Sequence, residues 1–143
     1  MAAAGYSAAL DAVASLLGAT GIAVAIEDEL AFAEQVFVVW LRERQAPDSV
    51  QPWATGFKAR FVVTIDVECR AFSLSLAGAV SACDALVKLA EDTLLPAPTL
   101  SGTVIGVQFT GGELASGQNE KTGAFVASST LQLECEMLAR YEV

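Results

Sequence analysis

The chain has 143 residues, of which 54% are hydrophobic, and its 17 acidic and 8 basic residues give a formal net charge of −9. This length suffices for one domain with its own core, and we treat residues 1–143 as a single domain. The acidic excess argues against sequence-specific nucleic-acid binding, which normally depends on a basic patch. Because the sequence contains no histidine, nucleophiles activated by a histidine base are excluded.

Residues 6–18 are predicted to form a helix, because apolar side chains recur there at helical spacing and glycines 18 and 21 follow. The small apolar residues at the N-terminus resemble a secretory signal only superficially. No Lys or Arg precedes them, and Asp11 interrupts the stretch. We therefore expect a protein made in the cytoplasm. The longest fully apolar runs, 21–26 and 36–41, are far shorter than the roughly 20 residues that a membrane-spanning helix needs.

Two strands are expected next, over residues 21–27 and 36–44. The second, VFVVWLRER, is apolar on both faces until its charged end, which is typical of a central strand covered on both sides. The segment 28–35 between them is compatible with a helical turn or an irregular crossing. Residues 45–57, QAPDSVQPWATGF, carry prolines and small polar residues and predict a long surface loop. Trp53 in this loop either contacts a partner or folds back onto the domain.

The clearest pattern is KARFVVTIDVECRAF, residues 58–72. Apolar residues at every second position from 61 to 69 predict a long strand with one buried and one solvated face. The last segment, about 124–141, shows the same alternation. Between these strands, Ser73 or Ser75 is expected to cap a helix that runs to about Leu95. Its predicted buried stripe consists of Leu76, Val80, Cys83, Val87, Ala90 and Leu94.

Residues 100–110 predict a further strand, and the glycine-rich segment 111–123, GGELASGQNEKTG, predicts a mobile hairpin loop that leads into the last strand. A phosphate-binding role for this loop is disfavoured, because such loops run from a strand into a helix. The whole pattern predicts an α+β fold. We expect a mixed, mainly antiparallel sheet of about four to five strands, packed by two helices, with a long β-hairpin.

Paired carboxylates are the main candidates for chemistry, because each pair is spaced i, i+2 on a predicted strand and therefore projects from one face. Four such acids on one surface would suit Mg²⁺ or Ca²⁺. A catalytic carboxylate, however, needs a pocket that shifts its pKa, and these residues alternate on the solvated face. We therefore interpret them as a solvated acidic face and expect no enzyme activity, metal site or cofactor. The residues are Asp66, Glu68, Glu134 and Glu136.

The three cysteines, Cys69, Cys83 and Cys135, occupy predicted core positions. A zinc site needs thiolates or imidazoles at short spacing, and the sequence contains no such cluster. We interpret the three residues as buried free thiols that act as small hydrophobic side chains.

The order of these elements resembles the tail terminator (tail completion) proteins of long-tailed phages, including the lambda type. The similarity covers about residues 6–141 and lies in the N-terminal helix, the segments VFVVWLRER, RFVVTIDVECRAF and LAGAVSACDALVKLAEDTLL, the strand TVIGVQFTGG, the glycine-rich tip and the strand STLQLECEM. Residues 28–35 depart from the family pattern, which leaves the order of the first strands open. The resemblance implies a hexameric ring that caps the tail tube, stops its polymerisation and provides the surface to which the head is joined.

The resemblance also implies a location and partners. The protein would be assembled in the bacterial host cytoplasm and reside in the virion, at the head-proximal end of the tail. Its partners would be the tail tube protein and a head-completion or connector protein, with DNA passing through the channel without specific binding. The expected channel-facing acids are Asp66, Glu68, Glu134 and Glu136. The expected partner or subunit contacts are Trp53, Phe57, Glu113, Gln118, Asn119 and Lys121.

Two alternatives remain open. A small α+β ligand-binding or regulatory module, dimeric through its exposed sheet face, would need a concave apolar pocket with a few polar groups. Another phage structural protein, such as a tube subunit or a neck adaptor, would share most of the same physical features. The exposed sheet face and the long hairpin distinguish a ring protein, in which they form subunit contacts, from a ligand module, in which they wrap a cavity.

Overall fold

A computed structural model describes residues 6–27, 34–44, 49–53, 56–97, 99–100, 104, 106–111, 114–118 and 123–142. Within these described residues, two helices and seven strands follow one another. They are α1 (Tyr6–Gly18), β1 (Ala23–Ile26), β2 (Gln35–Arg44), β3 (Ser49–Trp53), β4 (Gly56–Ser73), α2 (Leu76–Leu94), β5 (Gly106–Thr110), β6 (Leu114–Gln118) and β7 (Phe125–Glu142).

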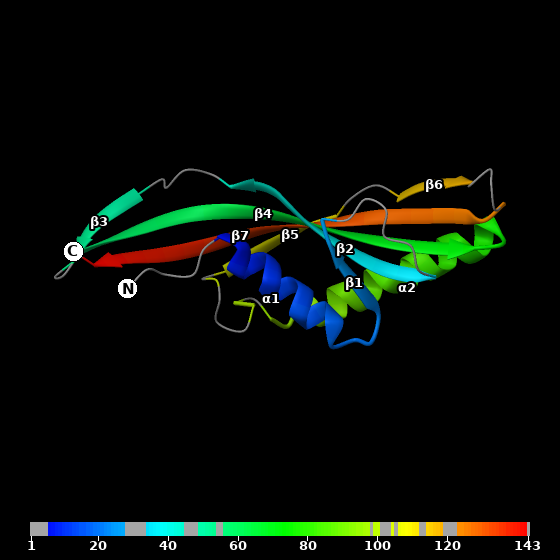
Figure 1. Ribbon diagram of the computed structural model, residues 1–143, viewed down its shortest axis with the longest axis horizontal. Helices are drawn as coiled ribbons and strands as arrows, with labels where there is room; N and C mark the ends of the chain where they lie inside the picture. The colour runs from blue at the N-terminus through cyan, green and yellow to red at the C-terminus, as the bar shows by residue number, and fades with distance from the viewer. Residues whose placement is uncertain are drawn as a thin grey trace.

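The sheet is built on the antiparallel pair β4 and β7, which are 18 residues long each. Their pairing runs from Gly56 opposite Glu142 to Ser73 opposite Phe125 without a register shift. At about 3.3 Å per residue, this pair is about 60 Å long. Figure 1 shows it as the long axis of the molecule. Strands β2 and β3 follow each other along β4, and β5 and β6 follow each other along β7.

Strand β1 pairs with β2 in parallel, and all the other pairings are antiparallel. The order β1-β2-β4-β7-β5 makes the sheet five strands wide. The expected α+β fold with a mixed, mainly antiparallel sheet and two helices is therefore confirmed. The order of the first strands, which the sequence left open, is also settled, since β2 lies between β1 and β4.

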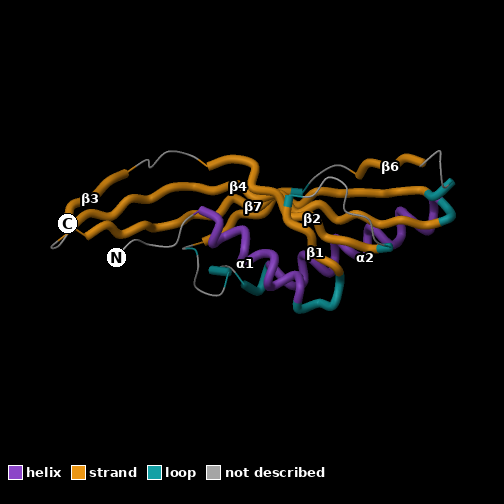
Figure 2. Tube along the Cα trace, in the orientation of Figure 1, coloured by secondary structure: helices purple, strands orange, loops and turns teal. Residues whose placement is uncertain are grey.

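Both helices lie on the same side of the sheet (Figures 1 and 2). The odd-numbered residues of β4 and β7 face them and form the core with Val13 and Leu17 of α1 and Leu86 and Leu94 of α2. On β2, Phe37 and Val39 join this core, while Val36 and Val38 are buried on the opposite face. The expectation that this strand is covered on both faces is confirmed. Among the described residues, no helix has the length and apolar composition that a membrane span requires.

Helix α2 begins at Ser75, whose Oγ accepts a hydrogen bond from the Gly78 backbone N–H at 3.0 Å. The predicted cap is thus confirmed at the second of the two candidate serines. The predicted stripe is partly wrong, because Leu76 is exposed and Val80 and Val87 are only half-buried. A second apolar row runs along the helix, in which Ala79 and Leu86 take the places of Val80 and Val87, and this second row is the buried one. Its members are Ala79, Cys83, Leu86, Ala90 and Leu94.

Two predicted loops each contain a strand. Within 45–57, residues 49–53 form β3 and pair with the start of β4, and Pro52 is tolerated because the described pairing of β3 uses one edge only. Within 111–123, residues 114–118 form β6 and pair with β7. In both cases backbone hydrogen bonds to a long neighbouring strand override a composition typical of loops. The strand predicted over 100–110 begins only at Gly106.

One end of the sheet extends beyond both helices. It consists of β3, residues 56–60 of β4 and residues 138–142 of β7, and we call it the arm. Figure 1 shows neither helix beneath it.

The three cysteines are free, as predicted, and are fully buried. The Cys83 thiol donates a hydrogen bond to the Cys69 carbonyl at 3.3 Å, which joins α2 to β4. Burial raises the pKa of Cys69 to about 12, with a smaller contribution from the neighbouring Cys83. Burial likewise raises the pKa of Cys135 to about 12. These thiols therefore stay protonated in the folded protein at pH values where the unfolded chain ionises them.

This difference predicts an alkaline loss of stability. Below about pH 8 the thiols are neutral in both states, but between about pH 9 and 12 only the unfolded chain releases their protons, so unfolding becomes easier as the pH rises. We expect roughly 1.5 kcal/mol of unfolding free energy to be lost per thiol between pH 8 and 10. Urea unfolding with a reductant present measures this. Cys135→Val should reduce the loss by one thiol's share, and an unchanged pH dependence would contradict the prediction.

Candidate functional site

The face of the sheet opposite the helices carries the predicted acidic residues. The register places Asp66 opposite Gln132, Thr64 opposite Glu134 and Val62 opposite Glu136. Even-numbered residues of β4 and β7 therefore share this face, and all four predicted carboxylates project from it. The prediction that they share one surface is confirmed, whereas their position in a channel stays a prediction.

Three of the four carboxylates are paired with an arginine on the same face. Arg42 Nε lies 2.8 Å from Asp66 Oδ2, and Arg60 Nε lies 2.9 Å from Glu136 Oε1. Arg70 binds Glu68 through two nitrogens, with Nε donating to Oε2 at 3.0 Å and Nη2 to Oε1 at 2.9 Å. We call these three pairs, together with Glu134, the charged ladder. Among the described residues, Glu134 has no ion-pair partner.

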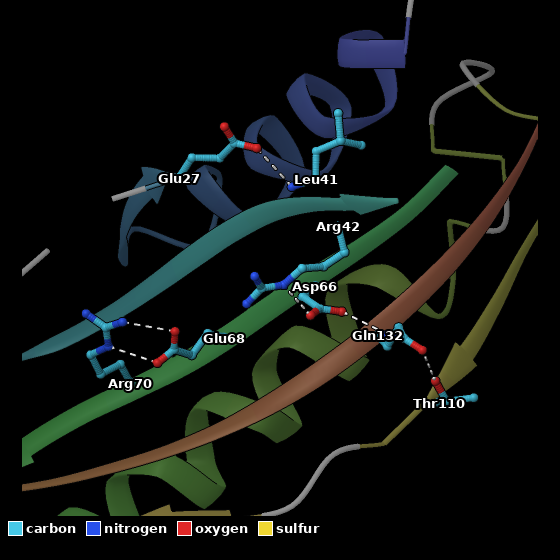
Figure 3. A network of polar contacts seen from close by, with 8 residues as sticks. All are labelled: Glu27, Leu41, Arg42, Asp66, Glu68, Arg70, Thr110 and Gln132. Atoms are coloured by element: carbon cyan, nitrogen blue, oxygen red, sulfur yellow. Dashed lines mark hydrogen bonds and ion pairs between the residues drawn. The ribbon is translucent and has the colours of Figure 1, made fainter. Parts of the chain in front are cut away.

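A continuous set of polar contacts crosses the sheet near Asp66 (Figure 3). Thr110 Oγ1 donates to Gln132 Oε1 at 3.5 Å, and Gln132 Nε2 donates to Asp66 Oδ1 at 3.1 Å. Arg42 completes the set and also lies over the Trp40 ring, 5.1 Å from its centroid. This network connects β5, β7, β4 and β2 through side chains, in addition to the backbone ladder.

Arg42 reaches Asp66 because β2 is irregular at this point. The register shifts between Leu41 and Glu43, so Arg42 occupies an extra position in the strand. Glu27 Oε1 accepts a hydrogen bond from the Leu41 N–H at 3.2 Å and so holds the backbone beside the irregularity (Figure 3). Alternation in the sequence identified the carboxylates, but the arginine partners depend on register and on this bulge.

Solvent reaches the ladder unevenly. The side chains of Asp66 and Glu68 are 13% and 20% exposed. Toward the arm, Arg60 and Glu136 are 47% and 39% exposed, and Glu134 is exposed as well. The prediction of a uniformly solvated acidic face is therefore corrected. Carboxylates near the middle of the sheet are half-buried and need a partner, and the accessible charge lies toward the arm.

A hollow of about 350 Å³ lies beside the exposed end of the ladder. Glu134, Glu136 and Gln108 supply its polar lining, and Gly106, Val62 and Val107 supply the rest. Within the part of the chain that the structure describes, no three Asp, Glu, His or Cys side chains come together in a way that would hold a metal ion. The ladder presents fixed, mostly paired charges along a surface.

The predicted contact residues do not form one patch. Trp53 ends β3 and Phe57 stands next to the start of β4, so both belong to the arm. Gln118 ends β6, at the opposite end of the sheet, where its Nε2 donates to the Gly123 carbonyl at 3.3 Å. Glu113, Asn119 and Lys121 lie outside the described residues.

A second surface feature was missed by the sequence analysis. An apolar groove of about 640 Å³ separates α2 from β6. Leu76, Val80 and Val87 of the apolar row that the sequence assigned to the core line this groove, whereas Ala90 and Leu94 of the same row are buried in the core as predicted. The row itself was the available signal. The lining residues are Leu76, Ala77, Val80, Ser81, Cys83, Asp84, Val87, Leu114 and Ser129.

Comparisons with known proteins give limited information. No protein-family model matches the chain, and no curated protein matches it significantly. Among solved structures, the chain is similar to a protein in the virion of a native gene transfer agent (GTA) particle. The similarity covers 87% of this chain and 84% of that chain, with 17% sequence identity and a TM-score of 0.36. Similarity at this level does not establish a shared function.

The network around Asp66 yields a stability prediction. Asp66→Ala removes the acceptor of both Arg42 and Gln132 and leaves a half-buried amide unpaired, so we expect a loss of about 1–2 kcal/mol of unfolding free energy. The control is Asp92→Ala, which breaks the exposed Lys88–Asp92 pair at 3.5 Å. This change should cost no more than about 0.5 kcal/mol. Chemical denaturation of both variants measures the difference, and equal losses would show that the network adds nothing.

Proposed function

We propose that this chain is a structural virion protein that forms a ring on the tail tube of a phage. The ring would cap the tube, terminate its polymerisation and join the tail to the head or connector. It would be assembled in the host cytoplasm and remain at the head-proximal end of the tail. The order of elements in the sequence, which resembles the tail terminator proteins, supports this assignment.

One structural observation carries the proposal. The sheet is much longer than the helices that cover it, so a 143-residue chain leaves an arm, one charged face and strand edges available to other subunits. Open strand edges and apolar surfaces of this kind favour association. The described surface features are extended and lie far apart, which suits a protein with several neighbours. We therefore propose a structural and not an enzymatic role.

We further propose that the charged ladder faces the channel of the ring. DNA is a polyanion and adheres to lysines and arginines that are free to bind its phosphates. On the ladder, Arg42 and Arg60 are each held by a carboxylate, and Glu134 adds an unpaired negative charge. A DNA duplex that passes the described part of the ladder would meet arginines that already bind a carboxylate, and we expect it to slide without being retained.

We assign the arm, which includes Trp53 and Phe57, to contact with a neighbouring protein of the tail. Its three strands extend beyond the helices, so a partner can contact this part of the sheet without disturbing them. A tail tube protein is the partner that the ring assignment requires.

Native mass spectrometry and negative-stain imaging across a concentration series test the ring. We expect rings of about six subunits with a central hole, because the proposal needs a closed assembly around a channel. A compact dimer at every concentration would contradict the proposal and favour the ligand-binding module.

The role of the ladder gives a separate prediction. The triple variant Asp66→Asn, Glu134→Gln, Glu136→Gln releases Arg42 and Arg60, and we expect at least a tenfold gain in affinity for duplex DNA at low salt that disappears as salt is added. Fluorescence anisotropy with a labelled duplex measures it.

A matched control separates local release from net charge. Asp11→Asn, Asp84→Asn, Glu91→Gln removes the same number of negative charges from the helices and should leave DNA binding unchanged. Equal gains in the two triple variants would show that only the overall charge matters, and the ladder would then have no special role.

A further inference from the structure

The two edges of the sheet are open at the same level. The register connects the two edges through successive pairs. Val24 of β1 pairs with Phe37 of β2, Phe37 with Cys69 of β4, Cys69 with Ser129 of β7, and Ser129 with Leu114 of β6. Four steps of about 4.8 Å separate the two edge strands by about 19 Å. Among the described strands, β1 pairs only with β2 and β6 pairs only with β7.

Each edge strand has a hollow between itself and the neighbouring helix. At the β6 edge this is the groove against α2, with a volume of about 640 Å³. At the β1 edge, a hollow of about 360 Å³ is lined by Asp11, Ala14, Ser15, Val24 and Ile26. Both hollows lie on the helix side of the sheet, so the two edges have the same layered construction.

Three of the five large apolar side chains that are exposed among the described residues lie at these edges, and the other two are Leu74 and Leu95. Ile26 at the β1 edge is 47% exposed, and Leu76 and Leu114 at the β6 edge are 45% and 53% exposed. Strand edges that must stay free usually carry lysine or another charge, whereas β1 (AVAI) and β6 (LASGQ) carry none. Depletion of charge is typical of the centre of an interface.

A second copy of this chain is the occupant that these features fit. Copies with a net charge of −9 repel one another, so contact between them is favoured where both surfaces are uncharged. The edge strands β1 and β6 carry no charge, and one aspartate lines each neighbouring hollow, Asp11 beside β1 and Asp84 beside β6. The two edges also match in layer order, with strand beside strand and helix beside helix.

We propose that the α1–β1 edge of one copy docks on the α2–β6 edge of the next copy. Strand β1 then lies along β6 and continues the sheet, and Ile26 enters the groove lined by Leu76, Val80 and Leu114. The contact joins two different patches, so repetition produces a ring when the rotation closes. This inference rests on the proposed function and names the surfaces through which the ring is made.

Disulfide trapping tests the contact directly, because the three native cysteines are buried. Ile26→Cys protein is mixed with Leu114→Cys protein and oxidised with copper phenanthroline in air. We expect the mixed disulfide to form at least tenfold faster than with Leu95→Cys, which places the thiol at a leucine that is 52% exposed and lines neither hollow. Equal rates would overturn the inference, as would preferential Leu114→Cys homodimers.

A second test uses variants in which one of the two edges carries an aspartate that blocks docking. Ile26→Asp and Leu114→Asp should each abolish assembly, whereas their equimolar mixture retains one intact contact and forms dimers only. Leu95→Asp should assemble as the parent does. Rings of the parent protein without preferential Ile26–Leu114 trapping would overturn this contact and leave the ring standing. Preferential trapping with open chains in place of rings would support the contact and contradict the ring.

Discussion

The uninterrupted pairing of β4 with β7 is the constraint on which the rest of the structure depends. Eighteen consecutive residue pairs alternate between the two faces. The odd positions share the face that packs on the helices between residues 61 and 71 and between 127 and 137, and the even positions share the face of the charged ladder. A slip of one residue would move the whole apolar set to the other face. The core residues that the helices cover and the polar network across the sheet both oppose such a slip. The same pairing places β1 and β6 at one level, although they stand at opposite ends of the sequence.

The charged ladder stabilises a sheet face that neither of the described helices covers. Carboxylates that are only 13–20% exposed lose much of their hydration, and a bound partner replaces the lost contacts with water. Arg42 and Arg70 fulfil that role here, and Gln132 adds a hydrogen bond from the neighbouring strand. On this face, polar contacts between side chains hold neighbouring strands together, whereas on the opposite face apolar packing does so. As a result, Arg42, Arg60 and Arg70 on this face each bind a carboxylate of the protein itself.

Much of this fold was predictable, because alternation over residues 61–69 and along the last strand states which face is buried. The ends of both helices followed from glycines, a serine cap and spacing. Strand β6 was not predictable, since LASGQ has no alternation and is a strand only because β7 extends beside it. The Arg42–Asp66 pair was equally hidden, since it depends on a bulge in one strand and on the register with another. Helix α2 misled the prediction because two adjacent apolar rows, one through Ala79 and Leu86 and one through Val80 and Val87, fit the same spacing.

That second row explains a feature of the composition. A chain in which 54% of residues are hydrophobic carries more apolar side chains than its single helix–sheet core uses. Part of the surplus lies at the two edges, because Leu76, Val80 and Val87 line the groove beside β6 and Ile26 stands at the opposite edge. Leu74 and Leu95 are exposed elsewhere. Charge shows the reverse distribution and collects on the open face and along the exposed sides of the helices. If copies dock as proposed, their attraction is directed along the plane of the sheet, while the charged face resists adhesion. A protein that must join its neighbours side by side and leave one surface free requires this separation of apolar edges from charged faces.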